Sequence, residues 1–271
     1  MPPFTPPFTV VIPARYRSNR FPGKPLALLT GASGVVTSLV ERSWRCAQDV
    51  PGAQAVYVAT DDARIADAVR AFGGEVVMTS PDCRNGTERC AEAVKTLGLG
   101  DGIVVNLQGD APLTPAFVIP DLVAALNAEP DTAMATVALR TSPGSYAHLA
   151  ADAAAGRVGG TTVVTTATGR ALYFSKRVLP YVPPTQNDTA HERVRLHLGV
   201  YAYRGDALAG YAAMPPSPLE ELEGLEQLRF LEADRPVRVL TFDPVGWDCI
   251  ELNNPGDIPA IEAILAERGI E

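Results

Sequence analysis

The chain has 271 residues and a formal net charge of −8, with 46% hydrophobic and 20% charged residues. This composition is ordinary for a soluble globular protein, and the length suits a single large domain. The acidic balance excludes a general nucleic-acid binder, whose footprint would be a basic surface. The cysteines form no C-x-x-C pair and have no histidine cluster beside them, so we expect reduced thiols, no zinc site and a cytoplasmic location.

The amino-terminal sequence MPPFTPPFTVVIPA carries no basic region ahead of an apolar run, and its prolines interrupt the apolar residues. Neither a signal peptide nor a membrane span is therefore expected there. The first predicted element is a strand at 9–13, because a short β-branched apolar run ends at Pro13.

The first half of the chain alternates between short apolar strands and helices. The elements expected after the first strand are, in order, helix 36–48, strand 55–60, helix 62–73, strand 75–80, helix 86–98, a strand that starts at 102 and runs into a loop by 113, and helix 114–128. The strands are apolar throughout rather than alternating, which indicates a parallel sheet covered on both faces. We therefore predict an α/β fold with a doubly wound, mostly parallel sheet.

The second half is less regular. Strands are expected at 132–140, at 161–176 with a hairpin turn at 167–169, at 196–204 and at 237–243, and helices at 217–234 and 255–269. We interpret residues 1–271 as one domain, in which about 131–216 form a smaller, irregular α+β insertion for dimerisation and acceptor binding. No internal repeat is visible.

The stretch VVIPARYRSNRFPGKPL places Arg15, Arg17, Arg20 and Lys24 directly after the first strand. Pro and Gly favour an irregular loop whose amides can approach phosphate oxygens, and Arg15 and Lys24 can neutralise them. The loop matches neither the Walker A motif nor G-x-G-x-x-G. A solvated basic loop is the alternative, but ligands of such folds bind at strand carboxyl ends, so we favour a small anion held there.

Three more polar loops, TDD, NGTER and LQGD, follow predicted strands. Asp110 of LQGD can bind Mg²⁺, or it can simply cap the turn before Pro112. Beside a triphosphate loop, such a metal would polarise the α-phosphate and balance charge on the departing pyrophosphate. NGTER, from Asn85 to Arg89, can read a base or a sugar, or it is only a helix N-cap.

The histidines differ in their surroundings. His148 and His191 lie in polar stretches and are expected on the surface. His197 shares a predicted strand face with Tyr201 and Tyr203, which indicates either the wall of a polar pocket or a satisfied core.

Together these segments resemble the 3-deoxy-manno-octulosonate cytidylyltransferases, or CMP-Kdo synthetases. The resemblance follows the chain nearly end to end, through IPARYRSNRFPGKPL, VYVATDDARIADAVRAFGGEVVMTSPDCRNGTER, VVNLQGDAP, GRALYFSK, HLGVYAYR and SPLEELEGLEQLRFLE. It implies a GT-A-like nucleotidyltransferase, usually a homodimer, that uses Mg²⁺. Such an enzyme joins CMP from CTP to the anomeric hydroxyl of a 2-keto-3-deoxy sugar acid and releases pyrophosphate.

The resemblance also implies site residues. The catalytic ones would be Arg15, Lys24 and Asp110. The nucleotide would contact Ala14, Arg15, Lys24, Asn85, Gly86, Arg89 and Gln108. The acidic acceptor would contact Arg20, His197, Tyr201, Glu226 and Gln227, with the planar fork of Arg20 matching a carboxylate. Asp110 would bind the metal.

The sequence departs from the family pattern at several charged positions. Ala111, Thr162 and Leu196 stand where the family has Glu, Lys and a basic residue. The second metal-binding Asp becomes Asn253, or Asp248 if the G-x-D of GWD is aligned instead. Asn can ligate Mg²⁺ through its carbonyl oxygen but brings no charge, so metal affinity should fall unless another carboxylate compensates.

These losses of charge leave alternatives open. The acceptor is either a sugar acid such as Kdo or another acidic metabolite such as a phosphonate. A related enzyme using another nucleotide and a sugar phosphate is a second hypothesis. A non-catalytic nucleotide-binding homologue is the third.

Overall fold

The computed structural model describes residues 7–18 and 20–271. The strands are β1 Phe8–Ala14, β2 Leu28–Thr30, β3 Val36–Ser38, β4 Ala53–Thr60, β5 Glu75–Met78, β6 Ile103–Leu107, β7 Met134–Arg140, β8 Thr162–Thr165, β9 Ala171–Ser175, β10 Arg195–Arg204 and β11 Val237–Phe242. The α-helices are α1 Leu39–Gln48, α2 Ala63–Ala71, α3 Gly86–Leu97, α4 Val118–Ala128, α5 Pro143–Ala154, α6 Gly205–Tyr211, α7 Pro218–Glu223, α8 Leu228–Glu232 and α9 Ile258–Arg268. The 3₁₀ turns are η1 Lys24–Leu26, η2 Pro184–Glu192 and η3 Pro255–Asp257.

The opening residues 1–6, on which the exclusion of a signal peptide or span largely rested, lie outside the described part. Within that part, none of the helices combines the length and the apolar character that crossing a membrane requires.

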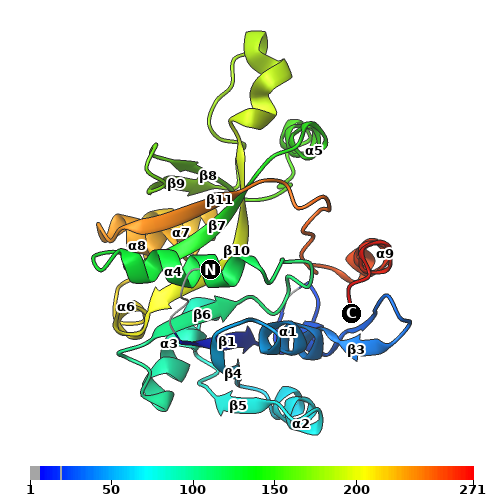
Figure 1. Cartoon of the computed structure of the whole chain (residues 1–271), viewed down its shortest axis with the longest axis vertical. Helices are drawn as coiled ribbons and strands as arrows, with labels where there is room; N and C mark the ends of the chain where they lie inside the picture. Colours follow the sequence, from blue (N-terminus) through cyan, green and yellow to red (C-terminus); the bar gives the residue numbers. More distant parts are fainter. Residues whose placement is uncertain (1–6, 19) are drawn as a thin grey trace.

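One large sheet organises the molecule (Figure 1), with strand order β11-β7-β10-β6-β1-β4-β5. Strands β6, β1, β4 and β5 run parallel, and β11 is parallel to β7. The long strand β10 enters antiparallel between β6 and β7. The predicted doubly wound, mostly parallel α/β fold is confirmed, with β10 as the antiparallel member.

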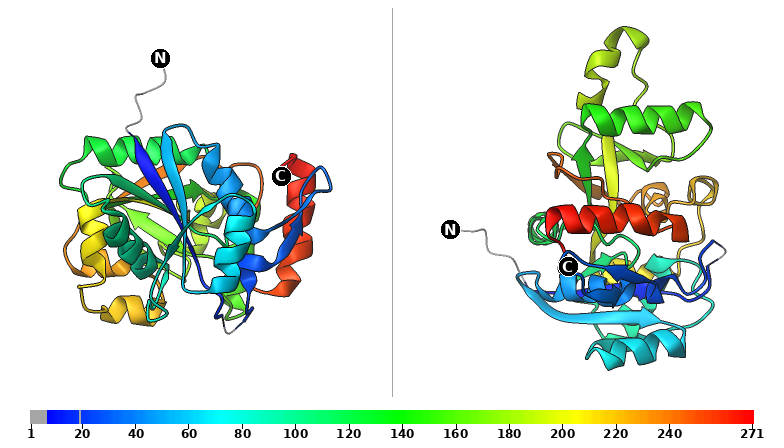
Figure 2. Two further views of the ribbon diagram at one scale, coloured as in Figure 1. Left: turned by 90° about the horizontal axis from the view of Figure 1, so that it is seen from below. Right: turned by 90° about the vertical axis from the view of Figure 1, so that its right-hand side faces the viewer.

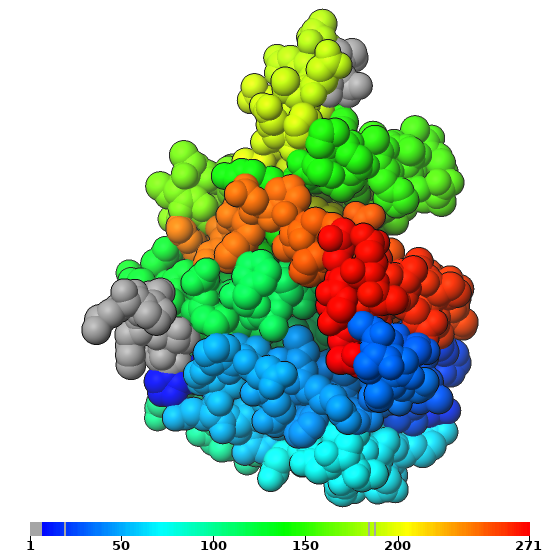
Figure 3. Space-filling view, turned by 45° about the vertical axis from the view of Figure 1, so that its right-hand side comes forward, coloured from blue at the N-terminus to red at the C-terminus, as the bar shows by residue number. Residues whose placement is uncertain are grey.

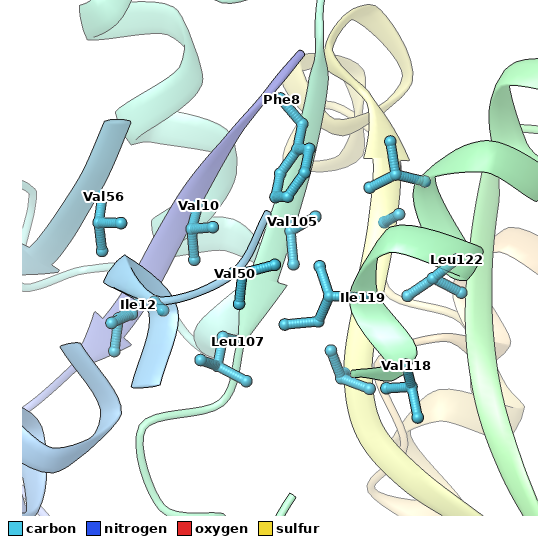
Figure 4. Close-up of a cluster of buried hydrophobic side chains, with 14 of the residues drawn as sticks. Phe8, Val10, Ile12, Val50, Val56, Val105, Leu107, Val118, Ile119 and Leu122 are labelled. Atoms are coloured by element: carbon cyan, nitrogen blue, oxygen red, sulfur yellow. The ribbon is translucent and has the colours of Figure 1, made fainter. Parts of the chain in front are cut away.

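Both faces of the sheet are covered, as the continuous apolar strands predicted. On one face Val10 and Ile12 pack with α1, α2 and α4, as Figure 4 shows for Ile119 and Leu122 of α4. On the other face Val11 packs toward α3, α6 and α8. Side chains that alternate along β1 therefore enter two different cores.

Two predicted helices have different bounds. Residues 36–38 pair with β2 as strand β3, and α1 begins only after Ser38, whose side chain accepts the amide of Glu41. The expected helix 217–234 is broken by Gly224 at φ 61°, which ends α7 before α8 starts. A glycine in the left-handed region is a helix stop signal, and it overrode the helical spacing on either side.

The middle of the chain contains elements that periodicity missed, among them α5, α6 and η2. Its strands β7 and β10 belong to the main path of the sheet, and β8 and β9 join the same sheet because β8 pairs with β10. Helix α5 and η2 project from the sheet, as Figure 2 shows. The role of residues 131–216 as an insertion stays a prediction.

The paired faces predicted for β10 are present. Leu198, Val200 and Ala202 enter one core, and Tyr201 and Tyr203 the other. Against β7, the strand carries an irregularity between Leu198 and Tyr201. The bulge adds two residues, a full period of a strand, so the alternation continues beyond it.

We predict that Gly205→Ala will destabilise the fold. An added Cβ would lie 2.0 Å from the carbonyl oxygen of Leu99, and the backbone there is held because the amide of Gly205 donates to Gly102 at 2.8 Å. We expect a loss of about 3 kcal/mol in the free energy of unfolding, measured in urea. The matched control is Gly210→Ala in the same helix, where the Cβ meets open space. It should be neutral or add up to about 1 kcal/mol, and an equal loss in both variants would contradict the steric explanation.

Candidate active site

The loops after β1 and β6 lie side by side because these strands are parallel neighbours. Lys24 and Asp110, 86 positions apart, meet there with 2.7 Å between Nζ and Oδ2. A third segment joins them, since the amide of Leu252 donates to the carbonyl oxygen of Asp110 at 2.8 Å. Three distant parts of the sequence thus converge at one edge of the sheet, the edge where ligands of such folds bind.

The opening loop is folded back on itself. The amide of Gly23 donates to the carbonyl of Tyr16 at 2.8 Å, and Gly23 has a φ of 73°, which favours glycine. The Tyr16 ring would lie 3.1 Å from a Cβ at Gly23. On the ring sits the guanidinium of Arg64 from α2, 3.3 Å from the ring centroid. This cation–π contact was not expected from the sequence, although Arg64 lies only two residues beyond the TDD motif.

The arginines of the loop point to different partners. Arg15 is exposed just beyond Ala14, the buried last residue of β1, and its Nη1 donates to the carbonyl of Arg84 at 3.5 Å. Arg20 donates through Nη2 to Oδ1 of Asn253 at 2.9 Å. The loop therefore presents one guanidinium toward the NGTER turn and another toward the carboxyl-terminal segment.

The NGTER turn is built as a capped helix start. Asn85 accepts the amide of Glu88 through Oδ1 at 2.8 Å and donates through Nδ2 to Tyr211 and Glu220. At Gly86 an added Cβ would lie 3.4 Å from the side-chain nitrogen Nε2 of Gln108, so glycine allows the Gln108 side chain to approach closely. The N-cap interpretation holds, and it places the Gly86 backbone beside Gln108.

Arg89 lies in the interior rather than on the cleft wall. Its side chain is 3% exposed, forms an ion pair with Asp61 at 3.1 Å and donates to Thr79. Asp61 follows β4 and Thr79 follows β5, so Arg89 holds two strand ends together. Its predicted contact with the nucleotide stays a prediction.

Glu226 closes the same helix start from the other side. Its carboxylate accepts the amides of Thr87 at 2.8 Å and Gly86 at 3.2 Å. A carboxylate at a helix N-terminus is favourable, although burial raises the pKa of this group. The neighbouring Gln227 is buried with its Nε2 unpaired among the described residues.

His197 and Tyr201 form part of a buried row of rings. The centroid of His197 lies 5.1 Å from that of Phe174 and 5.5 Å from that of Tyr201, and its Nε2 is 3.0 Å from Oγ1 of Thr136. Burial lowers the pKa of His197 to about 3, so the ring is neutral at physiological pH. Burial raises the pKa of Tyr201 well above its usual value.

The two candidates for the second metal position lie apart. Asn253 faces Arg20, as described above, whereas Asp248 lines a separate hollow of about 370 Å³ together with Leu139 and Trp247. Sequence reasoning missed Glu251, whose carboxylate is close enough to Asp110 for that charge to raise its pKa, after the larger effect of desolvation. Across residues 7–18 and 20–271, no three His, Cys, Asp or Glu side chains form a ready metal cage.

Comparison with known proteins agrees with this arrangement. The model of the cytidylyltransferase family matches residues 9–237. The 3-deoxy-manno-octulosonate cytidylyltransferase of Maricaulis maris is 48% identical over 96% of this chain and 97% of its own length, and that of Porphyromonas gingivalis is 41% identical over 96% and 97%. The 8-amino-3,8-dideoxy-manno-octulosonate cytidylyltransferase of Shewanella sediminis is 39% identical over 95% and 98%.

A solved structure shares the fold closely. The CMP:2-keto-3-deoxy-manno-octonic acid synthetase complexed with CTP superposes with a TM-score of 0.81 and 32% identity, covering 97% of this chain and 99% of the other. The resemblance inferred from the sequence motifs is thereby confirmed. The chain belongs to the cytidylyltransferase family, among the 3-deoxy-manno-octulosonate cytidylyltransferases.

Proposed function

We propose that the protein transfers CMP from CTP to the anomeric hydroxyl of a 2-keto-3-deoxy sugar acid such as Kdo and releases pyrophosphate. The single observation that carries this is the meeting of Lys24 with Asp110 at the carboxyl ends of β1 and β6. The full-length likeness to relatives that bear this activity in their names supports it. In the reaction, the hydroxyl oxygen bonds to the α-phosphorus as the bond to the pyrophosphate oxygen breaks.

On the donor side, Lys24 and Arg15 would neutralise the triphosphate. Asp110 would hold Mg²⁺, and its partly buried carboxylate, balanced here by an ammonium group, suits a cation that keeps water and phosphate oxygens as its other ligands. When bound, Mg²⁺ would polarise the α-phosphate and balance charge on the departing pyrophosphate. Gly86 and Gln108 would lie beside the base and ribose.

On the acceptor side, Arg20 would meet the carboxylate of the sugar acid. The neutral ring of His197, the hydroxyl of Tyr201 and the unpaired amide of Gln227 offer hydrogen bonds to sugar hydroxyls. Glu226 already binds the start of α3, so it would connect this pocket to the nucleotide side.

Other departures from the family pattern lie in the interior. Ala111 is buried, and the hydroxyl of Thr162 donates to the carbonyl of Arg177 at 2.6 Å. The missing charges at positions 111 and 162 are therefore weaker evidence against Kdo as the acceptor than the sequence alone suggested. CMP transfer to an acidic metabolite other than Kdo, such as a phosphonate, remains the second candidate, because Leu196 stands where the family has a basic residue and cannot make that residue's charged contacts.

We also propose a homodimer and a cytoplasmic location. Between α5 and η2 the chain exposes Val158, Leu172 and Tyr181, with 59%, 58% and 81% of each residue accessible, and large exposed apolar side chains favour a subunit contact. All four cysteines are free, in keeping with a reducing compartment.

CTP should be the nucleotide that the protein selects. We expect CTP with Mg²⁺ to raise the melting temperature more than UTP, ATP or GTP, and pyrophosphate release to require CTP together with one acid from a panel of Kdo, its 8-amino analogue and phosphonates. Binding of CTP without turnover of any acceptor would favour the non-catalytic homologue instead.

Lys24→Met should lower kcat/KM for CTP by about 100-fold or more, since it removes a charge held at the triphosphate site. Arg17→Met is the matched control, because Arg17 is exposed in the same loop and has no assigned role. Pyrophosphate release measures both, and comparable losses would show that the charge of the loop as a whole, rather than Lys24, matters.

His197 makes stability depend on pH. Its pKa is about 3 in the folded protein and about 6.5 when unfolded, so the unfolded chain binds an additional proton between these values and stability is lost as pH falls. Between pH 7 and pH 5 the wild type should lose about 2 kcal/mol more than His197→Gln in urea unfolding. Parallel losses in the two proteins would mean that the histidine titrates normally.

A further inference from the structure

The segment Glu251–Asn253, here called the closing arm, lies against the loop that carries Asp110. Leu252 is buried in a core with Leu113 and Ile261, and its amide binds the carbonyl of Asp110 at 2.8 Å. Glu251 and Asn253 therefore face away from that core, toward Lys24, Arg20 and the Asp110 side chain. Figure 3 shows the red carboxyl-terminal helix that follows the arm lying against the blue β2–β3 hairpin, where Ala32 donates to the carbonyl of Ile270.

The carboxylate of Glu251 lies beside Gly199. Its Oε1 lies 3.7 Å from where a Cβ of Gly199 would be, and that Cβ would also lie 3.3 Å from Cγ of Gln108. Gly199 belongs to β10, two residues after His197. Glu251 is thus placed between the expected nucleotide side, at Gln108, and the strand that carries the expected acceptor residues.

The carboxylates of Glu251 and Asp110 are close enough for the charge of one to act on the other. Desolvation and the charge of Asp110 raise the pKa of Glu251, while the charges of Lys24 and Arg20 lower it. Two neighbouring carboxylates are unfavourable unless a cation is shared between them. In the structure the ammonium of Lys24, 2.7 Å from Asp110, supplies part of that charge.

Asn253 is engaged at both ends of its amide. Its oxygen accepts from Arg20 at 2.9 Å, and its side chain hydrogen-bonds the carboxylate of Glu251. An amide can accept from a guanidinium and donate to a carboxylate at once, whereas an Asp at 253 would repel Glu251. The asparagine therefore matches a glutamate two positions earlier, and its oxygen already accepts a hydrogen bond from Arg20.

We propose that Glu251, rather than Asn253 or Asp248, supplies the second carboxylate that faces Asp110 across the divalent cation of the nucleotide, and that Asn253 is the positioning residue that orients it. The proposal rests on the proposed function. It explains how the chain lacks an acidic residue at 253 without losing the charge: the carboxylate has moved two residues along the closing arm. Asp248, which lines a different hollow, has no part in it.

Manganese binding tests this without turnover. Bound Mn²⁺ is measured by electron paramagnetic resonance, with CTP present and no acceptor. Glu251→Gln and Asp110→Asn should each weaken Mn²⁺ affinity by at least about tenfold. Asp248→Asn should bind as the wild type does. Wild-type affinity in Glu251→Gln, or a loss in Asp248→Asn equal to that in Asp110→Asn, would overturn the assignment.

An exchange of charge sharpens the test. Asn253→Asp alone should not raise Mn²⁺ affinity, because it places a second negative charge beside Glu251. The double variant Glu251→Gln with Asn253→Asp should bind Mn²⁺ more tightly than Glu251→Gln alone. In the double variant the carboxylate is at position 253 and the amide at position 251. A gain in Asn253→Asp alone, with none in the double variant, would show that position 253 acts independently of Glu251.

Thermal stabilisation by CTP in EDTA serves as the check on folding and on the nucleotide pocket. Each variant should keep it, because neither carboxylate is assigned to the base or sugar. A wild-type protein that CTP does not stabilise would instead refute the proposed function, and the metal assignment with it.

Discussion

The contact between Lys24 and Asp110 is the interaction on which the site depends. Lys24 lies in the loop that follows β1 and Asp110 in the loop that follows β6, and these strands are parallel neighbours, so the sheet determines that the loops meet. With side chains that are only 17% and 30% exposed, this ion pair contributes little net stability, because the cost of desolvating both charges offsets their attraction. Its importance lies in holding a cation and a carboxylate together at the edge where a triphosphate and a divalent ion must both be received.

The surrounding structure keeps that edge in shape through buried charge. Arg229 binds Glu220 through two contacts of 2.6 Å and Glu88 through one of 3.3 Å, and these carboxylates also hold Asn85 and Arg84. Such networks add little net stability, yet loss of one partner leaves an uncompensated charge and is strongly destabilising. The network joins α7 and α8 to the start of α3. Together with Glu226 it fixes the backbone at Gly86, beside Gln108.

A second support comes from the end of the chain. Glu262 of α9 accepts the amide of Thr30, and the side chain of Glu271 accepts both the amide and the hydroxyl of Ser33. These bonds fasten α9 to the β2–β3 hairpin, which follows the opening loop. The closing arm is thereby held between β11 and α9, close to Asp110. A carboxylate on the closing arm is therefore held in a defined position near Asp110, as one carried by a strand of the sheet would be.

Much of this was predictable from local patterns. Apolar runs located the parallel strands, and the polar residues that follow them located the loops of the site, including Lys24, Asp110 and the N-cap at Asn85. Helix ends were less predictable where a competing signal intervened, as at Gly224 or in the hairpin strand at 36–38. Helices α5 and α6 carry no strong periodicity, so the sequence pattern did not predict them.

The sequence by itself determined the sheet class, the strand-end loops and the family, because these follow from the order and spacing of neighbouring residues. Only the tertiary structure decided which distant side chains meet: Glu226 with the amides of α3, Arg89 with Asp61, and Glu251 with Asp110. Electrostatic interactions act through space over a few ångströms, and residues 141 positions apart carry no local signal of such an encounter. The reason for an asparagine at position 253 therefore lies in the fold, which places its side chain beside the carboxylate of Glu251.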